Sequence, residues 1–353
     1  MEFLFTNYPP VKFSKRTFSD AFYEMIPKAT QLDIAVGYVS ADSLAELQKT
    51  VELNSNIERL NLLVGMHYFD GFTEVQYNAA MGLNHYLLSS QRGGVNLVTA
   101  FRYHGKLYSY SNNDGPFAGI IGSNNLSSIV DGGTRIYESS VLLDDKNDAS
   151  VMNKFITSLS TRASKNISDL DISHFNEENS LLDGQEFVEK ATTHEIVDAM
   201  RKIQPEFSFE IPIKPYEVSP QSNLNVFFGK GRQSRNGLVK PRHWYEVELI
   251  VPKEITTRSG YPKSQTESAV FEVITDDGWK FKCKVSGDYS KNFRSEGDLK
   301  ILGKWLKGRL ENKGALKVGE PVTRETLKKY GRDTFTLTKT EIPGLWYLDF
   351  GVK

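Results

Sequence analysis

The chain has 353 residues, of which 39% are hydrophobic and 25% are charged, and its formal net charge is −1. This length exceeds one ordinary compact core and predicts two domains. No segment approaches the roughly 18 uninterrupted apolar residues of a membrane span, and the N-terminus lacks the basic start of a secretory signal. The single cysteine, Cys283, excludes an internal disulfide and a cysteine-based zinc site, which fits a reducing cytoplasm.

The small net charge hides an asymmetry along the chain. Between Asn225 and Lys353 there are 25 Lys and Arg against 16 Asp and Glu, whereas the rest of the chain has 18 against 28. A basic module favours a polyanionic partner. A solvated basic face without a partner explains the same numbers equally well.

Residues 1–168 alternate the patterns of helices and strands, which predicts an α/β domain. Helices are expected where apolar residues recur at helical spacing: 17–29, 40–53 and 72–91. Strands are expected where short apolar or alternating runs occur: 31–39, 57–66, 95–101, 105–111, 117–123 and 135–143.

Residues 169–222 are predicted to link this domain to the next. Within them, 169–189 contain seven acidic residues and no Lys or Arg. Residues 186–203 suggest a short helix, and 204–220 are Pro-rich and extended.

Residues 223–353 are predicted to form a mainly-β domain. Residues 268–287 indicate a hairpin around Asp277 and Gly278. Its second strand alternates four apolar residues with three lysines, so one face is expected to be buried. Helices are expected at 298–310 and 323–331, the second ending at Gly331, and strands at 333–339 and 345–351.

A pair of short motifs in the first domain carries chemistry. His104 and Lys106 stand two apart in an alternating run, and in a strand they point to the same side. Gly122, Ser123 and Asn125 form a turn that a returning strand brings to the same end of the sheet. A histidine can attack phosphorus or protonate a leaving oxygen, while a lysine and an amide can hold the charged oxygens. Either piece alone is also explained as an edge strand or an ordinary turn.

These residues resemble the signature of the phospholipase D superfamily, which is His-x-Lys, then Gly-Ser-x-Asn, then a downstream acid. The following positions match one by one: His104, Lys106, Gly122, Ser123 and Asn125. Glu138 stands where the family often has a supporting carboxylate. The Asp that the family usually has five residues after the lysine is replaced by Ser111, and Asp114 is out of register. His67 is expected to make a local hydrogen bond instead of serving this site.

The motif occurs once in the chain. An in-line displacement needs a nucleophile on one side of phosphorus and an acid on the other, and one histidine cannot stand on both sides. In the superfamily, members with a single motif pair two chains about a two-fold axis. The resemblance therefore implies a homodimer in which both copies of His104 line one site.

Two basic loops in the second domain carry side chains of the kinds that read base edges in the major groove. The first loop contributes Lys230, Arg232, Gln233, Arg235, Asn236, Lys240 and Arg242. The second contributes Asp288, Tyr289, Ser290, Lys291, Asn292 and Arg294. Each loop alone is also explained as a basic surface loop. Their layout resembles the B3-like DNA-recognition domain, an open barrel, or pseudobarrel, in which two arms grip the major groove.

A phospholipase D-like domain joined to a B3-like domain resembles the restriction endonucleases of the NgoFVII type. The resemblance implies a site-specific endonuclease of a restriction-modification system that cuts double-stranded DNA through a phosphohistidine. It implies no metal ion and no cofactor, and in some members a separately encoded ATPase partner. The acidic stretch 169–189 is then either a solvated spacer or a DNA mimic that covers the site.

Two other functions remain open from the sequence. A phospholipid hydrolase would share the motif but should have an amphipathic membrane-facing segment, and none is evident. A non-catalytic, sequence-specific DNA-binding protein would keep the basic loops and a vestigial site. The intact His104, Lys106 and Asn125 favour an enzyme.

Overall fold

The structure is a computed structural model, and it describes these residues: 1–130, 136–177, 180–220 and 224–352. Several positions that the sequence predictions include lie outside the described residues, among them Arg135 of an expected strand, Glu178 of the acidic stretch, and Asn223, where the recognition domain was expected to begin. Among the described residues, no helix combines the length and the apolarity needed to cross a membrane.

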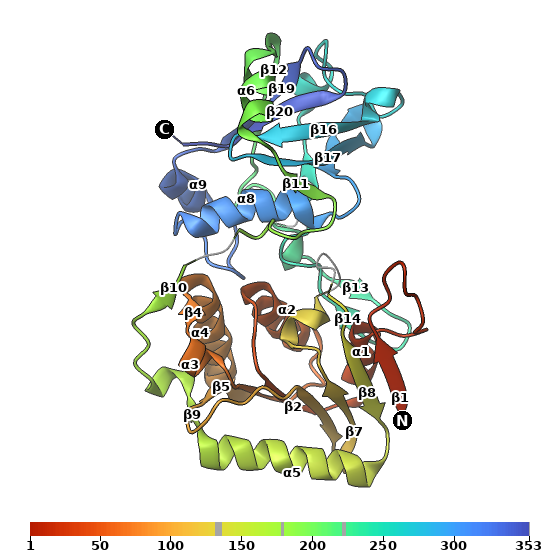
Figure 1. Cartoon of the computed structure of the whole chain (residues 1–353), viewed down its shortest axis with the longest axis vertical. Helices are drawn as coiled ribbons and strands as arrows, with labels where there is room; N and C mark the ends of the chain where they lie inside the picture. Colours follow the sequence, from red (N-terminus) through yellow and green to blue (C-terminus); the bar gives the residue numbers. More distant parts are fainter. Residues whose placement is uncertain (131–135, 178–179, 221–223, 353) are drawn as a thin grey trace. The chain divides into compact units, whose positions relative to one another are not determined.

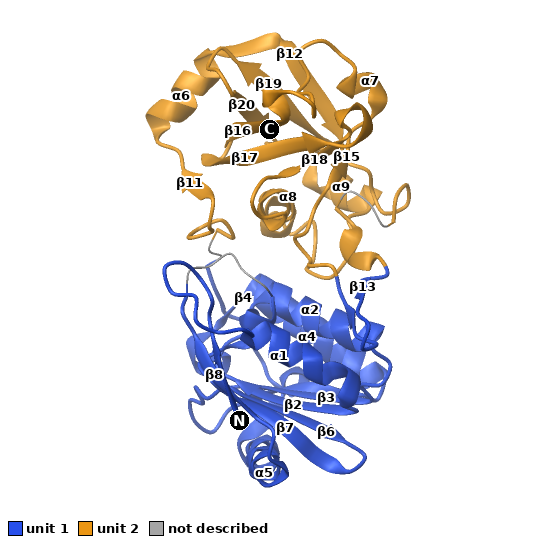
Figure 2. Cartoon of the chain, turned by 90° about the vertical axis from the view of Figure 1, so that its right-hand side faces the viewer, with its two compact units in different colours: residues 1–178, 230–241 blue, residues 179–229, 242–353 orange. Residues whose placement is uncertain are grey.

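Contacts divide the chain into two compact units, which Figure 2 shows in different colours. Unit 1 comprises residues 1–178 and 230–241. Unit 2 comprises residues 179–229 and 242–353. The short segment 230–241 therefore belongs by its contacts to the first unit, although it lies far along the chain.

Unit 1 is built on a mixed sheet with the strand order β1-β8-β7-β6-β2-β3-β5-β9. Strands β2, β3 and β5 run parallel, and the strands on either side of them pair antiparallel. The strands are β1 (Glu2–Phe5), β2 (Gln31–Val36), β3 (Arg59–Val64), β5 (Gly93–Val98), β6 (Leu107–Asn112), β7 (Gly115–Gly122), β8 (Ser139–Leu143) and β9 (Ser164–Asn166).

Helices cover both faces of this sheet (Figure 1). On one face lies α5 (Lys146–Ala163), whose Met152 and Ile156 pack with Ala35 and Leu63 of the central strands. The other face carries α1 (Phe18–Met25), α2 (Ala41–Leu53) and α4 (Glu74–Ser89). The unit is thus a three-layer fold of the α/β class that the sequence predicts.

The local sequence explains most of these elements. Strand β2 is buried along nearly its whole length, as a parallel strand between two helical layers must be. Helix α4 begins with a capping box, because the Thr73 hydroxyl accepts from the Gln76 N–H and the Gln76 side chain accepts from the Thr73 N–H. Helix α5 was not among the expected elements. Its signal is the apolar spacing of three and four residues from Ala149 to Ala163.

Shorter elements complete unit 1. A helical turn, α3 (His67–Asp70), leads into β4 (Phe72–Thr73), which pairs in parallel with β10 (Phe175–Asn176). The segment 230–241 forms a small hairpin of β13 (Arg232–Gln233) and β14 (Val239–Lys240). The short 3₁₀ turns are η1 (Ile26–Lys28), η2 (Leu126–Ile129) and η3 (Ile167–Asp169).

Unit 2 is built on a curled, mainly antiparallel sheet with the order β12-β19-β20-β16-β17-β18-β15, and β11 pairs beside it with β17 (Figure 2). The strands are β11 (Val188–Lys190), β12 (Ile203–Pro212), β15 (Leu249–Ile250), β16 (Val270–Thr275), β17 (Trp279–Ser286), β18 (Asn292–Ser295), β19 (Thr334–Thr340) and β20 (Leu345–Asp349). The helices and turns are α6 (Thr193–Arg201), α7 (Lys253–Thr256), α8 (Lys300–Asn312), α9 (Arg324–Tyr330), η4 (Val226–Phe228), η5 (Glu267–Ala269) and η6 (Asp288–Ser290).

The predicted hairpin of unit 2 is confirmed as β16 and β17, and the alternate residues of β17 are buried. Helix α9 ends at Gly331, which has a φ of +97°. The region expected to be a linker differs from that expectation. The segment 204–220 was expected to be an extended linker, but its first part forms strand β12, which pairs with β19 in the sheet of unit 2. The partner strand lies more than a hundred residues further along the chain, so the local sequence does not reveal this pairing.

Candidate active site and DNA-binding loops

The His-x-Lys and Gly-Ser-x-Asn motifs meet at one end of the sheet of unit 1. Lys106 directly precedes β6, and β7 ends at Gly122, whose N–H donates to the Lys106 carbonyl at 3.3 Å. His104 lies in the extended segment before β6, so the strand begins two residues later than expected. The carboxyl ends of β2 and β3 meet the same edge, because β2 pairs antiparallel with β6 and parallel with β3.

Lys106 and His104 face one another, as the spacing of two predicts. The Lys106 Nζ lies 3.2 Å from Nδ1 and 3.1 Å from Nε2 of the His104 ring, and it donates to the His104 carbonyl at 2.7 Å. His104 is exposed, whereas Lys106 is buried with a relative exposure of 6%. Burial lowers the pKa of Lys106, and the charge of Glu138 opposes that shift. A cation is therefore held below an exposed imidazole.

Two glycines allow the segment of His104 to lie against the sheet. A Cβ on Gly65 would lie 2.0 Å from the carbonyl oxygen of Tyr103, whose N–H in turn donates to the Gly65 carbonyl at 3.1 Å. A Cβ on Gly37 would lie 3.2 Å from the His104 ring. The strand ends β2 and β3 thus contact the backbone that carries the imidazole.

The Gly-Ser-Asn-Asn turn presents Ser123 and Asn125 at the same edge. The Ser123 hydroxyl donates to the Glu138 carboxylate, so the predicted serine and acid are in direct contact. The buried Asn124 holds the turn, because its side-chain oxygen accepts from the Ser140 hydroxyl at 2.5 Å and its carbonyl accepts from Tyr108 at 2.8 Å. The structure therefore brings all five predicted catalytic side chains to one end of the sheet.

Tyr38 is a residue of this site that sequence reasoning missed. Its N–H donates to the Asn125 side-chain oxygen at 3.1 Å, and its ring meets the His104 ring edge-on at 5.8 Å between centroids. Its hydroxyl donates to Asp70 at 2.7 Å, which raises the pKa of Tyr38 and lowers that of Asp70. Asp70 also accepts from Arg102 at 3.3 Å. Nothing in the local sequence marks Tyr38, because its partners come from other segments of the chain.

His67 makes local hydrogen bonds, as expected. Its Nε2 accepts from the Val39 N–H at 3.2 Å, and its Nδ1 lies 2.8 Å from the Gly71 carbonyl. Burial lowers its pKa, which favours the neutral form of the ring. It supports the Val39 backbone next to Tyr38, and its ring meets the Tyr38 ring edge-on at 5.4 Å between centroids.

The acid missing after Lys106 has a counterpart on a neighbouring strand. Asp33 of β2 pairs with Ser109 of β6, so its side chain lies on the same face as that of Ser111. This buried carboxylate accepts from Gln31 at 2.7 Å, Asn61 at 2.7 Å and Asn153 at 2.9 Å. Asp114 lies at the opposite, exposed end of the β6–β7 hairpin. In the described part of the chain, no three His, Cys, Asp or Glu side chains gather as metal ligands would.

The first basic loop is the hairpin of β13 and β14 in unit 1. Residues 232–237 are exposed, and this tip contains Gln233, Arg235 and Asn236. Lys240 does not extend to solvent in the same way, because its Nζ lies 4.4 Å from the centroid of the Tyr23 ring. Lys230 begins this segment, and Arg242 follows it in unit 2.

Arg242 forms an ion pair within unit 2. Its guanidinium donates to both carboxylate oxygens of Glu246, at 2.9 and 2.6 Å, and this hydrogen bonding raises its pKa. A bidentate pair of this kind fixes the side chain. The structure therefore gives Arg242 a role in the local fold next to the predicted arm.

The second basic loop is strained, and its Asp288 and Tyr289 are exposed, whereas Ser290 is buried. Tyr289 and Ser290 both have a φ of +58°, a conformation that side chains rarely adopt. Tyr289 is 61% exposed, and Lys253 places its Nζ 3.9 Å from the ring centroid. Strain of this kind is common at functional sites. Lys253, from α7, thus joins the loop that the sequence identified.

Asn292 and Arg294 of this loop lie in β18, and its other residues precede that strand. Arg294 lies 3.3 Å from Glu248 in a half-exposed ion pair, and Asn292 is partly buried. Asp288 and Lys291 flank the strained pair, and the Ser290 hydroxyl accepts from the Ser264 N–H at 2.8 Å. The loop therefore has a fixed base and an exposed, aromatic tip.

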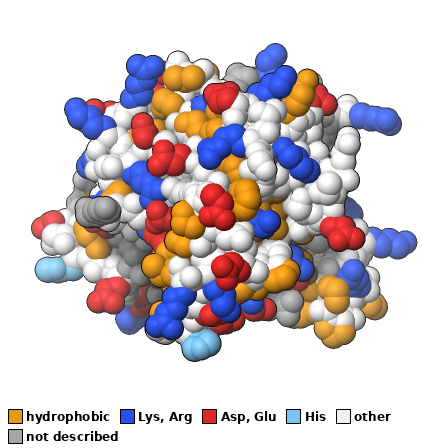
Figure 3. Space-filling model, turned by 90° about the horizontal axis from the view of Figure 1, so that it is seen from above, with side chains coloured by type: hydrophobic (Ala, Val, Ile, Leu, Met, Phe, Trp, Pro, Cys, Tyr) orange, Lys and Arg blue, Asp and Glu red, His pale blue; other side chains and the backbone are white. Residues whose placement is uncertain are grey.

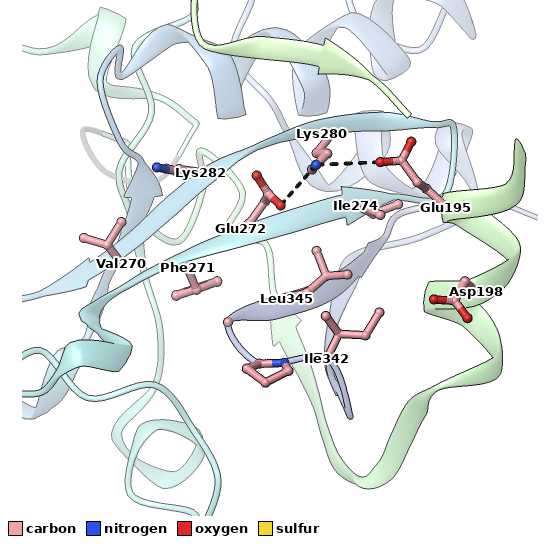
Figure 4. Close-up of a pocket in the computed structure, with 12 residues that line it drawn as sticks. Glu195, Asp198, Val270, Phe271, Glu272, Ile274, Lys280, Lys282, Ile342 and Leu345 are labelled. Atoms are coloured by element: carbon pink, nitrogen blue, oxygen red, sulfur yellow. Dashed lines mark ion pairs between the residues drawn. The ribbon is translucent and has the colours of Figure 1, made fainter. Parts of the chain in front are cut away.

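A groove of about 490 Å³ lies elsewhere in unit 2, between α6, the β16–β17 strands and the turn before β20 (Figure 4). Three of its charged groups are paired with one another, since Lys280 lies 3.3 Å from Glu272 and 3.8 Å from Glu195. Ile342 and Leu345 line its apolar side (Figure 4). The groove holds none of the predicted site residues.

The face of the molecule in Figure 3 shows cationic, anionic and apolar side chains interspersed. No single sign of charge dominates this view. The basic excess of the C-terminal part of the chain is therefore not gathered on this face.

Comparison with protein families identifies both domains. Residues 16–172 match the NgoFVII restriction endonuclease N-terminal PLD domain, and residues 199–341 match the NgoFVII C-terminal B3-like DNA-binding domain. The chain belongs to the NgoFVII restriction endonuclease family. It is a restriction endonuclease with a phospholipase D-like nuclease domain and a B3-like domain that binds DNA. Both resemblances inferred from the sequence are confirmed.

Known proteins outside this family are more distant. None of the curated proteins matches the chain. Among solved structures, NucT from Helicobacter pylori is 15% identical, with a TM-score of 0.34 over 47% of this chain and 99% of that chain. The phospholipase D family member Nuc from Salmonella typhimurium is 13% identical, with a TM-score of 0.32 over 47% of this chain and 98% of that chain.

Polyphosphate kinase from Porphyromonas gingivalis is a further similar structure. It is 9% identical, with a TM-score of 0.32 over 57% of this chain and 30% of that chain. These TM-scores are too low to carry an argument, so membership of the NgoFVII family rests on the two domain matches.

Proposed function

We propose that this restriction endonuclease acts as a homodimer that cuts double-stranded DNA at a specific site through a phosphohistidine on His104. The observation that supports this most is the meeting of His104, Lys106, Ser123, Asn125 and Glu138 at one end of the nuclease sheet. His104 is exposed and is the nucleophile. Lys106 and Asn125 hold the charged phosphate oxygens.

The reaction takes two displacements. A neutral ring nitrogen of one His104 attacks phosphorus, and the P–O bond to the leaving strand breaks as the P–N bond forms. His104 of the partner subunit is protonated and gives its proton to the leaving oxygen. It then takes a proton from water, whose oxygen attacks the same phosphorus and breaks the P–N bond. The first histidine is released neutral, and no metal ion is needed for any step.

Ser123 and Glu138 act together beside this histidine. The hydroxyl donates to the carboxylate, which fixes the direction of its proton and leaves its oxygen free to accept a hydrogen bond. The Ser139 N–H donates to the same hydroxyl at 3.0 Å. Glu138 therefore supports the site through Ser123 and through its charge on Lys106.

The homodimer supplies the second histidine. Phe101 and Ile121 are 48% and 45% exposed, and they flank the two motifs along the chain. Large apolar side chains beside a polar site favour coverage by another protein surface. A second copy that packs there brings its own His104 to the site. A separately encoded ATPase partner and a cytoplasmic location stay predictions of the family resemblance.

Sequence recognition falls to the two basic loops. The hairpin tip with Arg235 and Asn236 and the loop of Tyr289 and Arg294 carry the side chains that bind guanine and adenine edges. Their lysines contact phosphates and make the affinity for DNA dependent on salt.

Digestion of a plasmid in EDTA, followed by sequencing of the ends, tests the proposal. Discrete ends are expected with the natural chain, and His104→Ala should show no cleavage while it still binds the same duplex. His85→Ala is the matched control, because His85 is exposed on α4, outside the site. Cleavage by His104→Ala at the natural rate, or a strict need for added metal, would refute the mechanism.

A further inference from the structure

The first basic loop, residues 230–241, is assigned to different parts of the molecule by its sequence and by its contacts. By sequence, residues 230–241 fall inside the B3-like DNA-binding domain, which matches residues 199–341. By contacts, the same residues belong to unit 1, which is the nuclease unit. Particular side chains of the nuclease unit must therefore hold this hairpin in place.

Asn54 makes the closest attachment. This residue caps the end of α2, and it is 4% exposed. Its side-chain oxygen accepts from the Val239 N–H at 2.9 Å, and its side-chain nitrogen donates to the Val239 carbonyl at 2.9 Å. The amide thus pairs with both backbone groups of one residue, as a neighbouring strand would. The nitrogen also donates to the Thr50 carbonyl at 2.8 Å.

Two further contacts fix the base of the hairpin. The Lys240 ammonium lies over the Tyr23 ring, whose hydroxyl donates to the buried Glu46 of α2 at 3.0 Å. Gly231 has a φ of +72°, and a Cβ there would meet the Lys240 carbonyl at 2.7 Å and the Leu53 side chain at 3.2 Å. The base of the hairpin therefore lies directly on α1 and α2, while its tip stays exposed.

The other end of α2 leads to the candidate active site. The helix begins after Ser40, and Tyr38 donates its N–H to Asn125 and contacts the His104 ring. A helix of this length spans about 20 Å and is stiff. One rigid element thus carries the hairpin at its C-terminal end and adjoins the catalytic side chains at its N-terminal end.

We propose that Asn54 is a positioning residue that fixes the recognition hairpin 230–241 to the nuclease unit and so sets which phosphodiester is cut relative to the bases that the hairpin reads. The inference rests on the proposed function, because it assumes that the hairpin tip reads DNA and that His104 cuts it. Asn54 touches neither DNA nor the reacting atoms. It acts indirectly, because its hydrogen bonds to Val239 determine where the hairpin lies.

The test compares Asn54→Ala with Asn56→Ala in the full chain. Asn56 lies in the same turn after α2 and donates to the Ile26 and Ala29 carbonyls at 2.7 and 2.8 Å, so its loss costs similar hydrogen bonds without touching the hairpin. The substrate is a duplex with the sequence that the natural chain cuts in a plasmid. End positions, single-turnover rate, duplex affinity and melting temperature are measured for each variant.

With Asn54→Ala we expect cleavage to spread over neighbouring phosphodiesters and the rate at the natural position to fall about tenfold or more, since a misplacement of about 1 Å can cost a hundredfold. Affinity for the duplex should change much less, because the tip is intact. Asn56→Ala should keep the natural end and rate. If Asn54→Ala also cuts only the natural position at the natural rate, the inference is wrong.

A second variant changes Val239, the partner of Asn54, and so tests the same contact without altering α2. Val239→Pro removes the N–H that Asn54 accepts and leaves the helix cap intact. It should scatter the ends as Asn54→Ala does, and discrete natural ends would overturn the inference. Failure of the proposed function looks different, because then the natural chain gives no discrete ends or His104→Ala still cuts.

Discussion

The candidate catalytic edge of unit 1 and the second basic loop of unit 2, which is the reading loop around Tyr289, are built in opposite ways. At the catalytic edge, backbone lies against backbone, since a Cβ on Gly65 or on Gly122 would collide with Tyr103 or with Ser139 and Ser140. In the reading loop, Tyr289 is 61% exposed and contacts a lysine side chain. One site is fixed by close packing, and the other is held at its base and open at its tip.

The functions proposed for the two regions account for this difference. Transfer of a phosphoryl group needs the histidine and the cation placed to within a fraction of an ångström. Reading of bases needs side chains that can meet a groove whose shape varies with sequence. The strain at Tyr289 and Ser290 is local, and contacts with DNA can offset it. Substitutions should therefore act differently in the two regions.

The substitution Gly65→Ala tests most directly whether close packing fixes the catalytic edge. The new Cβ would lie 2.0 Å from the Tyr103 carbonyl, so the segment that carries His104 must move by more than about 1 Å. Cleavage should fall more than about a hundredfold. The single-turnover rate on a duplex with the natural site measures this.

Gly82→Ala is the control for this substitution. Gly82 lies in α4, and a Cβ there would meet nothing within 4 Å, so alanine should stabilise the helix by about 0.5–1 kcal/mol and leave cleavage unchanged. A natural cleavage rate in Gly65→Ala would mean that the close contact at the catalytic edge is unimportant.

Lys106→Met separates activity from stability at the same edge. Burial lowers the pKa of Lys106, which means that the fold disfavours its charged form. Removal of the ammonium should lower cleavage about a hundredfold, because a charged partner of the phosphate is lost. The free energy of unfolding in urea should stay the same or rise, most clearly at low pH, where the lysine is charged in both states.

The control for Lys106→Met is Lys165→Met, since Lys165 is exposed on β9. That variant should change neither cleavage nor stability. A loss of stability in Lys106→Met that matches its loss of activity would show that the lysine has a structural role instead of a chemical one.

How far the sequence predicted this molecule depends on the range of the interactions. The β6–β7 hairpin and its motifs lie within about twenty residues of sequence, so residue types and spacing sufficed to bring His104 and Ser123 together. Tyr38 went unnoticed, because its contacts with Asn125 and Asp70 depend on how β2, η2 and α3 converge. The hairpin of Lys240 could be recognised by composition, but its attachment to Asn54 spans 185 residues and has no local signal.

The reading loops are probed by Arg235→Ala and Arg294→Ala. If each arginine binds a base edge, its loss should weaken binding of the natural site by about 1–3 kcal/mol. Arg294 also lies 3.3 Å from Glu248, so its removal leaves a carboxylate near DNA and should have the larger effect. Titration of a labelled duplex with and without the site measures both.

Lys328→Ala is the control for these two arginines, because Lys328 is exposed on α9, outside both loops. A loss shared equally by specific and unspecific duplexes would assign the arginines to phosphates. Unchanged affinity in both variants would show that the two loops do not read DNA.

The smallest expected effect concerns the core of the DNA-binding domain. Lys307 of α8 is fully buried, donates to the Trp244 carbonyl at 2.6 Å, and lies one helical turn from Glu311. Glu311 itself accepts from the Trp244 and Tyr245 side chains at 2.9 and 2.8 Å. Burial lowers the pKa of Lys307 to about 7, and the charge of Glu311 opposes that shift.

The folded pKa of Lys307 is therefore below that of the unfolded chain, which stays near 10.5. Between these values the unfolded chain binds more protons, so stability should rise with pH, by about 2 kcal/mol from pH 7 to pH 9. Lys307→Met should remove this rise, because methionine fills similar space without a proton to lose. Urea unfolding of both chains at several pH values measures the difference. Cleavage by Lys307→Met at pH 7 should match that of the natural chain, since the catalytic edge lies in the other unit. If the stability of the natural chain does not change with pH over this range, Lys307 stays charged in the core.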